Sequence, residues 1–172
     1  MRALADAERL RTLFRELAAA TKEETTIFVT GGATAVLYGW RRTTVDADLV
    51  FVPERDELYR AIQRLKEEVQ VNVEIASPAH FIPELPGWRD RSPFIAREGT
   101  VSFHHYDLYA QALAKVERGH EKDMADVLEM LRRGLVEPGK LRELFTAIQP
   151  GLHRYPAVDP KSFRARLEAV LG

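Results

Sequence analysis

The stretch that decides the fold of this 172-residue chain runs from Thr26 to Val52, TIFVTGGATAVLYGWRRTTVDADLVFV. It predicts a buried strand, a Gly-Gly turn, a short helix, a basic loop and a second strand that carries Asp46 and Asp48. Because successive side chains of a strand point to opposite faces, both aspartates leave the same face of the sheet. This acidic face is the feature that the rest of the sequence has to explain.

The opposite face of the second strand is apolar and is expected to enter the core, through Val45, Ala47, Leu49 and Phe51. The acidic face needs a balancing charge, because removing a lone carboxylate from water is costly. A divalent cation is one such balance, and the neighbouring Arg41 and Arg42 are another. The sequence leaves both alternatives open.

Composition narrows the class of protein. The chain is 45% hydrophobic and 30% charged, which predicts one globular domain or a domain with a small helical appendage. It contains no cysteine, so disulfides, thiolate metal sites and cysteine nucleophiles are excluded. The net charge of -1 gives no overall basic field for nucleic acid. No segment has the apolar run of a signal peptide or membrane span, so we expect a cytoplasmic protein with no membrane partner.

The remaining pattern predicts an α+β fold with a small mixed sheet, an N-terminal helix and a C-terminal helical region. Helices are predicted around residues 5–21, 33–38 and 58–69, strands at 26–30, 45–52 and 71–75, a hairpin at 93–97 and 100–104, and helices beyond 106. In the third strand, Val71, Val73 and Ile75 are expected to point inward and Glu74 to the other face. We therefore predict an α/β core at 1–105 and a helical region at 106–172 packed on it.

The first candidate for chemistry is Gly31-Gly32, which lies between a strand and a helix. Glycines in such a turn let the backbone approach a ligand, and the helix start offers N–H groups to a phosphate. The alternative is a tight turn that needs a positive φ. Taken alone, the dipeptide favours the turn.

The second candidate is the set formed by Asp46, Asp48 and Glu74. Hard cations such as Mg²⁺ prefer carboxylate oxygens, and two such ions can be held about 3.5–4 Å apart for phosphoryl chemistry. The alternative is a solvated acidic face beside the two arginines. Without context the two interpretations are even.

The third candidate is a helical set of Lys115 and Arg118 on one face and Asp123 and Asp126 on another. A lysine near a carboxylate cluster could bind nucleotide phosphates as a point charge. The alternative is that Lys122 and Asp126, four residues apart, form an ordinary surface pair. From these residues alone the surface pair is favoured.

The histidines give a weaker signal. His104 and His105 are adjacent on a predicted strand and therefore point to opposite faces, so they cannot easily bind one metal ion. Structural or surface roles are predicted for these and the other histidines.

The first three features occur together and in order, and this order resembles the signature of the DNA polymerase β-type nucleotidyltransferase superfamily. In that signature a Gly-Gly or Gly-Ser turn opens a short helix and D-x-D follows on the next strand. The chain is most similar to small prokaryotic nucleotidyltransferases of the abortive-infection and toxin–antitoxin kind, whose pattern is G-G followed by R-x-T-x-D-x-D. The residues that carry it are Gly31, Gly32, Arg42, Thr44, Asp46 and Asp48.

The resemblance implies an enzyme that transfers a nucleotide from an NTP to an acceptor hydroxyl with Mg²⁺, as one ion or two. It assigns the metal to Asp46, Asp48 and Glu74, and counts these with Lys115 as catalytic. The nucleotide-binding positions that it implies are Thr30, Gly31, Gly32, Arg42, Thr44, Arg118, Asp123 and Asp126. The expected partners are an acceptor RNA such as a tRNA 3′ end, or a protein, and a cognate toxin or antitoxin.

Three functions remain open from the sequence. The first is a toxin-like or phage-defence enzyme that modifies RNA, which the long spacing between Gly32 and Asp46 favours. The second is an antitoxin-type enzyme that modifies a partner protein. The third is a catalytically inactive module that binds a nucleotide or a partner.

Overall fold

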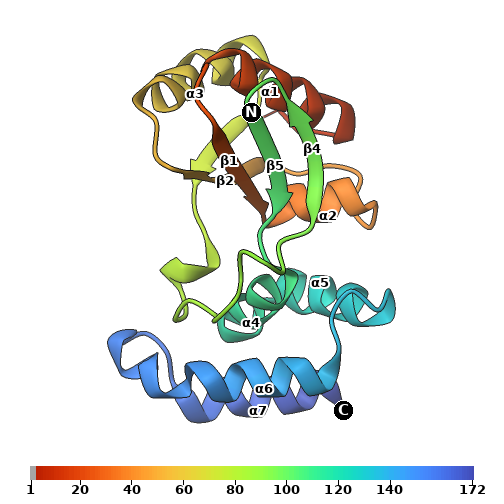
Figure 1. The fold of residues 1–172 in the computed structure, drawn as a ribbon. Coiled ribbons are helices and arrows are strands. Elements are labelled where there is room, and N and C mark those ends of the chain that lie inside the picture. Colours follow the sequence, from red (N-terminus) through yellow and green to blue (C-terminus); the bar gives the residue numbers. More distant parts are fainter. Residues whose placement is uncertain (1–2) are drawn as a thin grey trace. The chain divides into compact units, whose positions relative to one another are not determined.

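The structure is a computed structural model that describes residues 3–172 (Figure 1). The chain forms two compact units. The first contains the residues up to Ser77 together with Pro93–His105, and the second contains Pro78–Ser92 and Tyr106–Gly172. The predicted α+β class is confirmed, with an N-terminal helix, a mixed sheet of five strands and a C-terminal helical region.

The first unit is built on one sheet with the strand order β3-β2-β1-β5-β4. Its strands are β1 (Thr25–Thr30), β2 (Asp46–Val52), β3 (Asn72–Ile75), β4 (Phe94–Glu98) and β5 (Val101–His105). β1 pairs antiparallel with β2 and parallel with β5, β2 pairs parallel with β3, and β4 with β5 forms the predicted hairpin. β1 therefore lies at the centre of the sheet (Figure 1).

The helices of the first unit are α1 (Ala7–Ala19), α2 (Gly32–Tyr38) and α3 (Asp56–Glu68). α1 begins where the Asp6 carboxylate accepts a hydrogen bond from the Arg9 N–H, a common N-cap arrangement. Its apolar stripe is buried, and Phe14 stacks on Phe103 of β5 with ring centroids 4.5 Å apart. The helices thus cover the face of the sheet that carries its apolar side chains.

The predicted alternation on β2 is confirmed inside the strand and fails outside it. Ala47, Leu49 and Phe51 are buried as expected. Val45, however, is 39% exposed, because β2 begins only at Asp46. Ile75, predicted to point inward, is 40% exposed, because it is the last residue of the edge strand β3.

The second unit consists of the helices α4 (Leu108–Arg118), α5 (Glu121–Arg132), α6 (Pro138–Ile148) and α7 (Pro160–Leu171), with short 3₁₀ turns at η1 (Pro78–His80) and η2 (Gln149–Arg154). α4 ends at Gly119, which adopts the left-handed conformation at φ +70°. The Arg166 guanidinium of α7 donates to the backbone carbonyls of Val116 and Glu117 near that end. These bonds satisfy carbonyls that a helix end leaves without partners.

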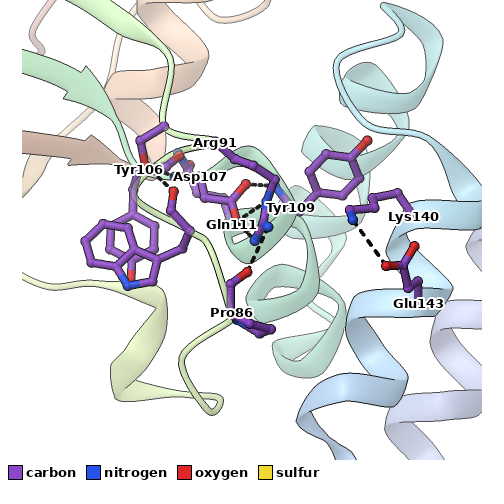
Figure 2. A network of polar contacts seen from close by, with 10 residues as sticks. Pro86, Arg91, Tyr106, Asp107, Tyr109, Gln111, Lys140 and Glu143 are labelled. Atoms are coloured by element: carbon purple, nitrogen blue, oxygen red, sulfur yellow. Dashed lines mark hydrogen bonds and ion pairs between the residues drawn. The ribbon is translucent and has the colours of Figure 1, made fainter.

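The segment 78–92 belongs to the second unit because a buried polar network ties it to the start of α4 (Figure 2). The Arg91 guanidinium donates to Asp107 Oδ2 through Nη2 at 2.7 Å and Nε at 3.1 Å, and Nη1 donates to the Pro86 carbonyl. Trp88 and Tyr106 stack with ring centroids 4.2 Å apart. The sequence prediction included this segment in the α/β core at 1–105. Its prolines and glycine gave no periodic pattern that would assign it to the helical region.

Among residues 3–172, no helix has the length and apolar character needed to cross a membrane.

Candidate functional site

The polar face of the sheet aligns three of the predicted site residues in one row. Asp48 of β2 lies opposite Thr30 of β1 on one side and opposite Glu74 of β3 on the other. Residues opposite each other on neighbouring strands share a face of the sheet. Asp46 follows on the same face, opposite Asn72.

The Gly31 position brings the turn and the acidic strand together. Gly31 has φ +67°, a left-handed conformation that other residues rarely adopt. A Cβ at this position would stand 2.5 Å from Asp48 Oδ2, so only the missing side chain lets the carboxylate lie against the turn. That these residues together bind a nucleotide stays a prediction from the resemblance.

The Gly32 position is crowded by the basic loop before β2. A Cβ there would stand 2.2 Å from Thr44 Oγ1 and 3.4 Å from Arg41 Nη1. The Thr44 hydroxyl donates to the Asp46 carbonyl at 3.0 Å, and the Thr44 backbone exchanges two hydrogen bonds with Ala5. The loop is therefore fixed at both its main chain and its side chain.

Arg41 is the basic residue that the structure places beside Gly32, and it is half-buried. Arg42, which the sequence pattern favours, is exposed. The sequence named both arginines as counter-charges for the aspartates, and the resemblance singled out Arg42.

Asn72 is a site residue that sequence reasoning missed. Its Nδ2 donates to Asp46 Oδ1 at 2.6 Å and lies 3.5 Å from Glu74 Oε1. Because side chains alternate along β3, Asn72 lies on the same face as Glu74. This alternation was the feature of the sequence that could have identified Asn72. Asn72 therefore links the first aspartate to the predicted third acidic residue.

The fit of a divalent cation depends on the two aspartates. Within residues 3–172, no group of three or more His, Cys, Asp or Glu side chains has an arrangement that could hold a metal ion. Mg²⁺, however, is commonly bound by one or two carboxylates together with substrate phosphates. Asp46 and Asp48 on one strand face offer that donor set, and the placement of Glu74 as a third ligand stays a prediction.

A buried imidazole lies beneath the glycine turn. The Thr34 hydroxyl of α2 donates to the Val29 carbonyl at 3.1 Å, so its oxygen is left to accept from His105 Nδ1 at 3.0 Å. Burial, with a smaller contribution from His104, lowers the pKa of His105 from 6.5 to about 4. His105 is therefore neutral near pH 7, and its ring stacks on Tyr38 at 4.5 Å.

The two adjacent histidines lie on opposite faces, as alternation predicted. His104 lies opposite Phe28 of β1 and Phe94 of β4, on the face that carries Asp48. His105 lies opposite Val29, on the apolar face. The two rings therefore do not share a site.

The helical set forms a buried ion-pair cluster in the second unit. Lys115 Nζ of α4 lies 2.8 Å from Asp126 Oδ2 and 3.7 Å from Asp123 Oδ1 of α5, and Arg118 Nη2 lies 2.6 Å from Asp123 Oδ1. The predicted surface pair of Lys122 with Asp126 is wrong, because Asp126 is 2% exposed and bonds to Lys115. A role for these residues in nucleotide binding stays a prediction from the resemblance.

A family model described as a nucleotidyltransferase of unknown function (DUF6036) matches residues 8–164. Comparison with curated proteins and with solved structures found no match. The matched range takes in the glycine turn, the aspartate strand and the helical cluster. The chain therefore belongs to this family of nucleotidyltransferases.

Proposed function

We propose that this member of the nucleotidyltransferase family transfers a nucleotide from an NTP to an acceptor hydroxyl, with release of pyrophosphate, at the glycine turn and the aspartate strand. The observation that carries the proposal is the contact of the Asp48 carboxylate with the turn at Gly31. It supports a single site that combines a backbone cradle with an acidic pair, as in enzymes of the DNA polymerase β type.

In this mechanism the chain binds and orients the reactants. Asp46 and Asp48 would hold Mg²⁺, which supplies charge neutralisation for the triphosphate and lowers the pKa of the acceptor hydroxyl. The Gly31-Gly32 backbone would hold the β and γ phosphates. Glu74, exposed in the row of Asp48, is the residue we assign to accept the proton of the acceptor hydroxyl.

The acceptor that we propose is an RNA hydroxyl, with a tRNA 3′ end as the first candidate, in a toxin–antitoxin-like or phage-defence role. The resemblance to toxin-type nucleotidyltransferases supports this choice. The second acceptor is the hydroxyl of a partner protein, as for antitoxin-type enzymes.

The test is transfer of label from each of the four α-labelled NTPs to a mixture of total RNA and lysate protein. We expect label in the RNA fraction with the wild-type protein and Mg²⁺, and none with Asp46→Ala. Glu16→Gln, an exposed change on α1, is the matched control and should transfer normally. Undiminished transfer by Asp46→Ala would sink the proposal, and label in the protein fraction alone would assign the second acceptor.

A second candidate function is a nucleotide-binding module without catalysis. It is favoured by the Asn72 amide on Asp46, and by the lack of a third converging carboxylate among residues 3–172. Calorimetry separates the two: Mg²⁺-dependent NTP binding by a protein that transfers no label to any acceptor would establish the module.

A further inference from the structure

We infer that Arg41, rather than Arg42 of the family-like pattern, binds the triphosphate of the nucleotide at the glycine turn and selects substrates that carry a polyphosphate. The inference rests on the proposed function, because it names the ligand of the same site. Its basis is the placement of two adjacent arginines of equal charge in different surroundings.

The Arg41 side chain reaches the turn. Its Nη1 lies 3.4 Å from the point where a Cβ of Gly32 would stand, beside Thr44 Oγ1 at the same glycine. A guanidinium at this position lies at the edge of the Gly31-Gly32 turn, where it would contact a phosphate bound by the turn. Arg42 is exposed, and none of its atoms is among the three nearest to a Cβ at either glycine.

The backbone explains how a residue beyond the end of α2 returns to its beginning. Gly39 adopts the left-handed conformation at φ +94°, which ends the helix. The N–H groups of Gly39, Trp40 and Arg41 then all point to the Ala35 carbonyl, at 3.0, 3.1 and 3.3 Å. The chain therefore folds back along α2, a helix of seven residues.

Aromatic stacking holds this fold-back in place. Trp40 stacks on Tyr38 with ring centroids 5.7 Å apart, and Tyr38 stacks in turn on the buried ring of His105 at 4.5 Å. His105 is fixed by its hydrogen bond with Thr34. The main chain of Arg41 is thus anchored to the core of the first unit, which reduces the cost of ordering this loop when a ligand binds.

The chemistry of the guanidinium suits a polyphosphate. Its planar fork donates two parallel hydrogen bonds to phosphate oxygens and keeps its charge at all ordinary pH values. Asp48 approaches the same turn, so a triphosphate that enters needs a cation to offset repulsion by the carboxylate. Because this contact involves phosphate and not the base, its effect should be the same for every NTP.

The test compares arginine variants in the labelled-transfer assay, with KM and kcat measured separately. We expect Arg41→Gln to raise KM about 10- to 100-fold, the size of a lost charge-assisted bond pair, by the same factor for all four NTPs. Inhibition by inorganic tripolyphosphate should weaken by a similar factor. Arg42→Gln should produce a smaller change, and Arg64→Gln, which removes only an exposed pair on α3, should produce none.

Two controls keep the outcomes separate. If the wild-type protein transfers no nucleotide, or Asp48→Asn transfers as well as the wild type, the proposed function fails. If transfer is normal but Arg41→Gln raises KM no more than Arg42→Gln, the inference about Arg41 is overturned. If Arg41→Gln does not fold, Arg41→Lys decides: it keeps the charge but lacks the fork, and a wild-type KM for this variant overturns the inference.

Discussion

Two clusters in this protein contain the same kinds of side chain, a pair of aspartates beside basic residues, in opposite surroundings. The sheet cluster consists of Asp46, Asp48 and Arg41, and the helical cluster consists of Asp123, Asp126, Lys115 and Arg118. The aspartates of the sheet cluster are partly exposed, and Asp48 lies against the turn at Gly31. Those of the helical cluster are buried and paired with Lys115 and Arg118 at 2.8 and 2.6 Å.

The difference shows what each arrangement is suited to do. Carboxylates buried against their counter-charges are closed to solvent and are held by ion pairs, so the loss of one leaves a partner charge in a low-dielectric interior. Carboxylates at a partly solvated sheet face, next to a backbone that lacks side chains, leave room for a ligand. Variants should therefore separate the two clusters into one that controls activity and one that controls stability.

The largest effect on activity is expected for Asp48→Asn. The variant keeps the shape of the side chain but removes the charge that faces the glycine turn, so nucleotide transfer should fall about 10³-fold or more. The melting temperature should change little, because the carboxylate is partly exposed. Steady-state transfer and thermal unfolding of the same preparations measure both quantities. A large fall in stability with normal transfer would reverse the roles given to the two clusters.

The largest effect on stability is expected for Asp126→Ala. This change leaves Lys115, 6% exposed, with only the longer 3.7 Å contact to Asp123, and should lower the free energy of unfolding by about 3–5 kcal/mol. Lys122→Ala on the same helix is the matched control, because Lys122 is exposed, and it should cost less than about 0.5 kcal/mol. Urea unfolding of both variants measures the difference. Equal losses would show that the buried pair is not what stabilises the helical unit.

The comparison also shows what sequence reasoning can and cannot reach. Alternation placed Ala47 and Leu49 in the core, since a paired strand leaves no choice of face. It failed for Val45, because where pairing begins depends on the partner strands. The class of fold was therefore predictable, and the ends of its elements were not.

The charged residues were harder to predict for the same reason. Spacing of four residues within a helix favoured Lys122 as the partner of Asp126, but packing of α4 against α5 brings Lys115 there instead. Similarly, the sequence pattern pointed to Arg42, whereas the backbone turn after Gly39 directs Arg41 to Gly32. Tertiary contacts that depend on a turn or a neighbouring helix leave no periodic trace in a single sequence.

A third effect, of intermediate size, is the pH dependence of stability that the buried His105 imidazole causes. His105 has a pKa of about 4 in the folded protein against 6.5 ordinarily, so between these pH values the unfolded chain binds a proton that the folded protein does not. The contribution of this pKa shift to the free energy of unfolding is therefore fully present above pH 6.5. It is lost as the pH falls toward 4, and the total loss is about 3 kcal/mol.

Unfolding of wild type and His105→Gln between pH 4 and 8 measures this effect. At pH 8 the difference between them reports packing alone, because the imidazole is neutral in both states. The two stabilities should then converge as pH falls. A constant difference across the range would show that the buried ring is not the source of the loss of stability in acid.

The sharpest test of the comparison comes from two glycines that both have a positive φ. Gly31 has φ +67° and ψ -139°, and Gly99, in the turn of the β4–β5 hairpin, has φ +57°, so alanine at either position should cost about 1–3 kcal/mol. A Cβ at Gly99 meets nothing within 4 Å, whereas at Gly31 it meets Asp48 Oδ2 at 2.5 Å. The carboxylate is the mobile partner in that clash, so the Gly31→Ala variant should displace Asp48 and lose transfer, whereas Gly99→Ala should transfer normally. Equal transfer by the two variants would mean that the contact between the turn and the aspartate strand has no part in the activity.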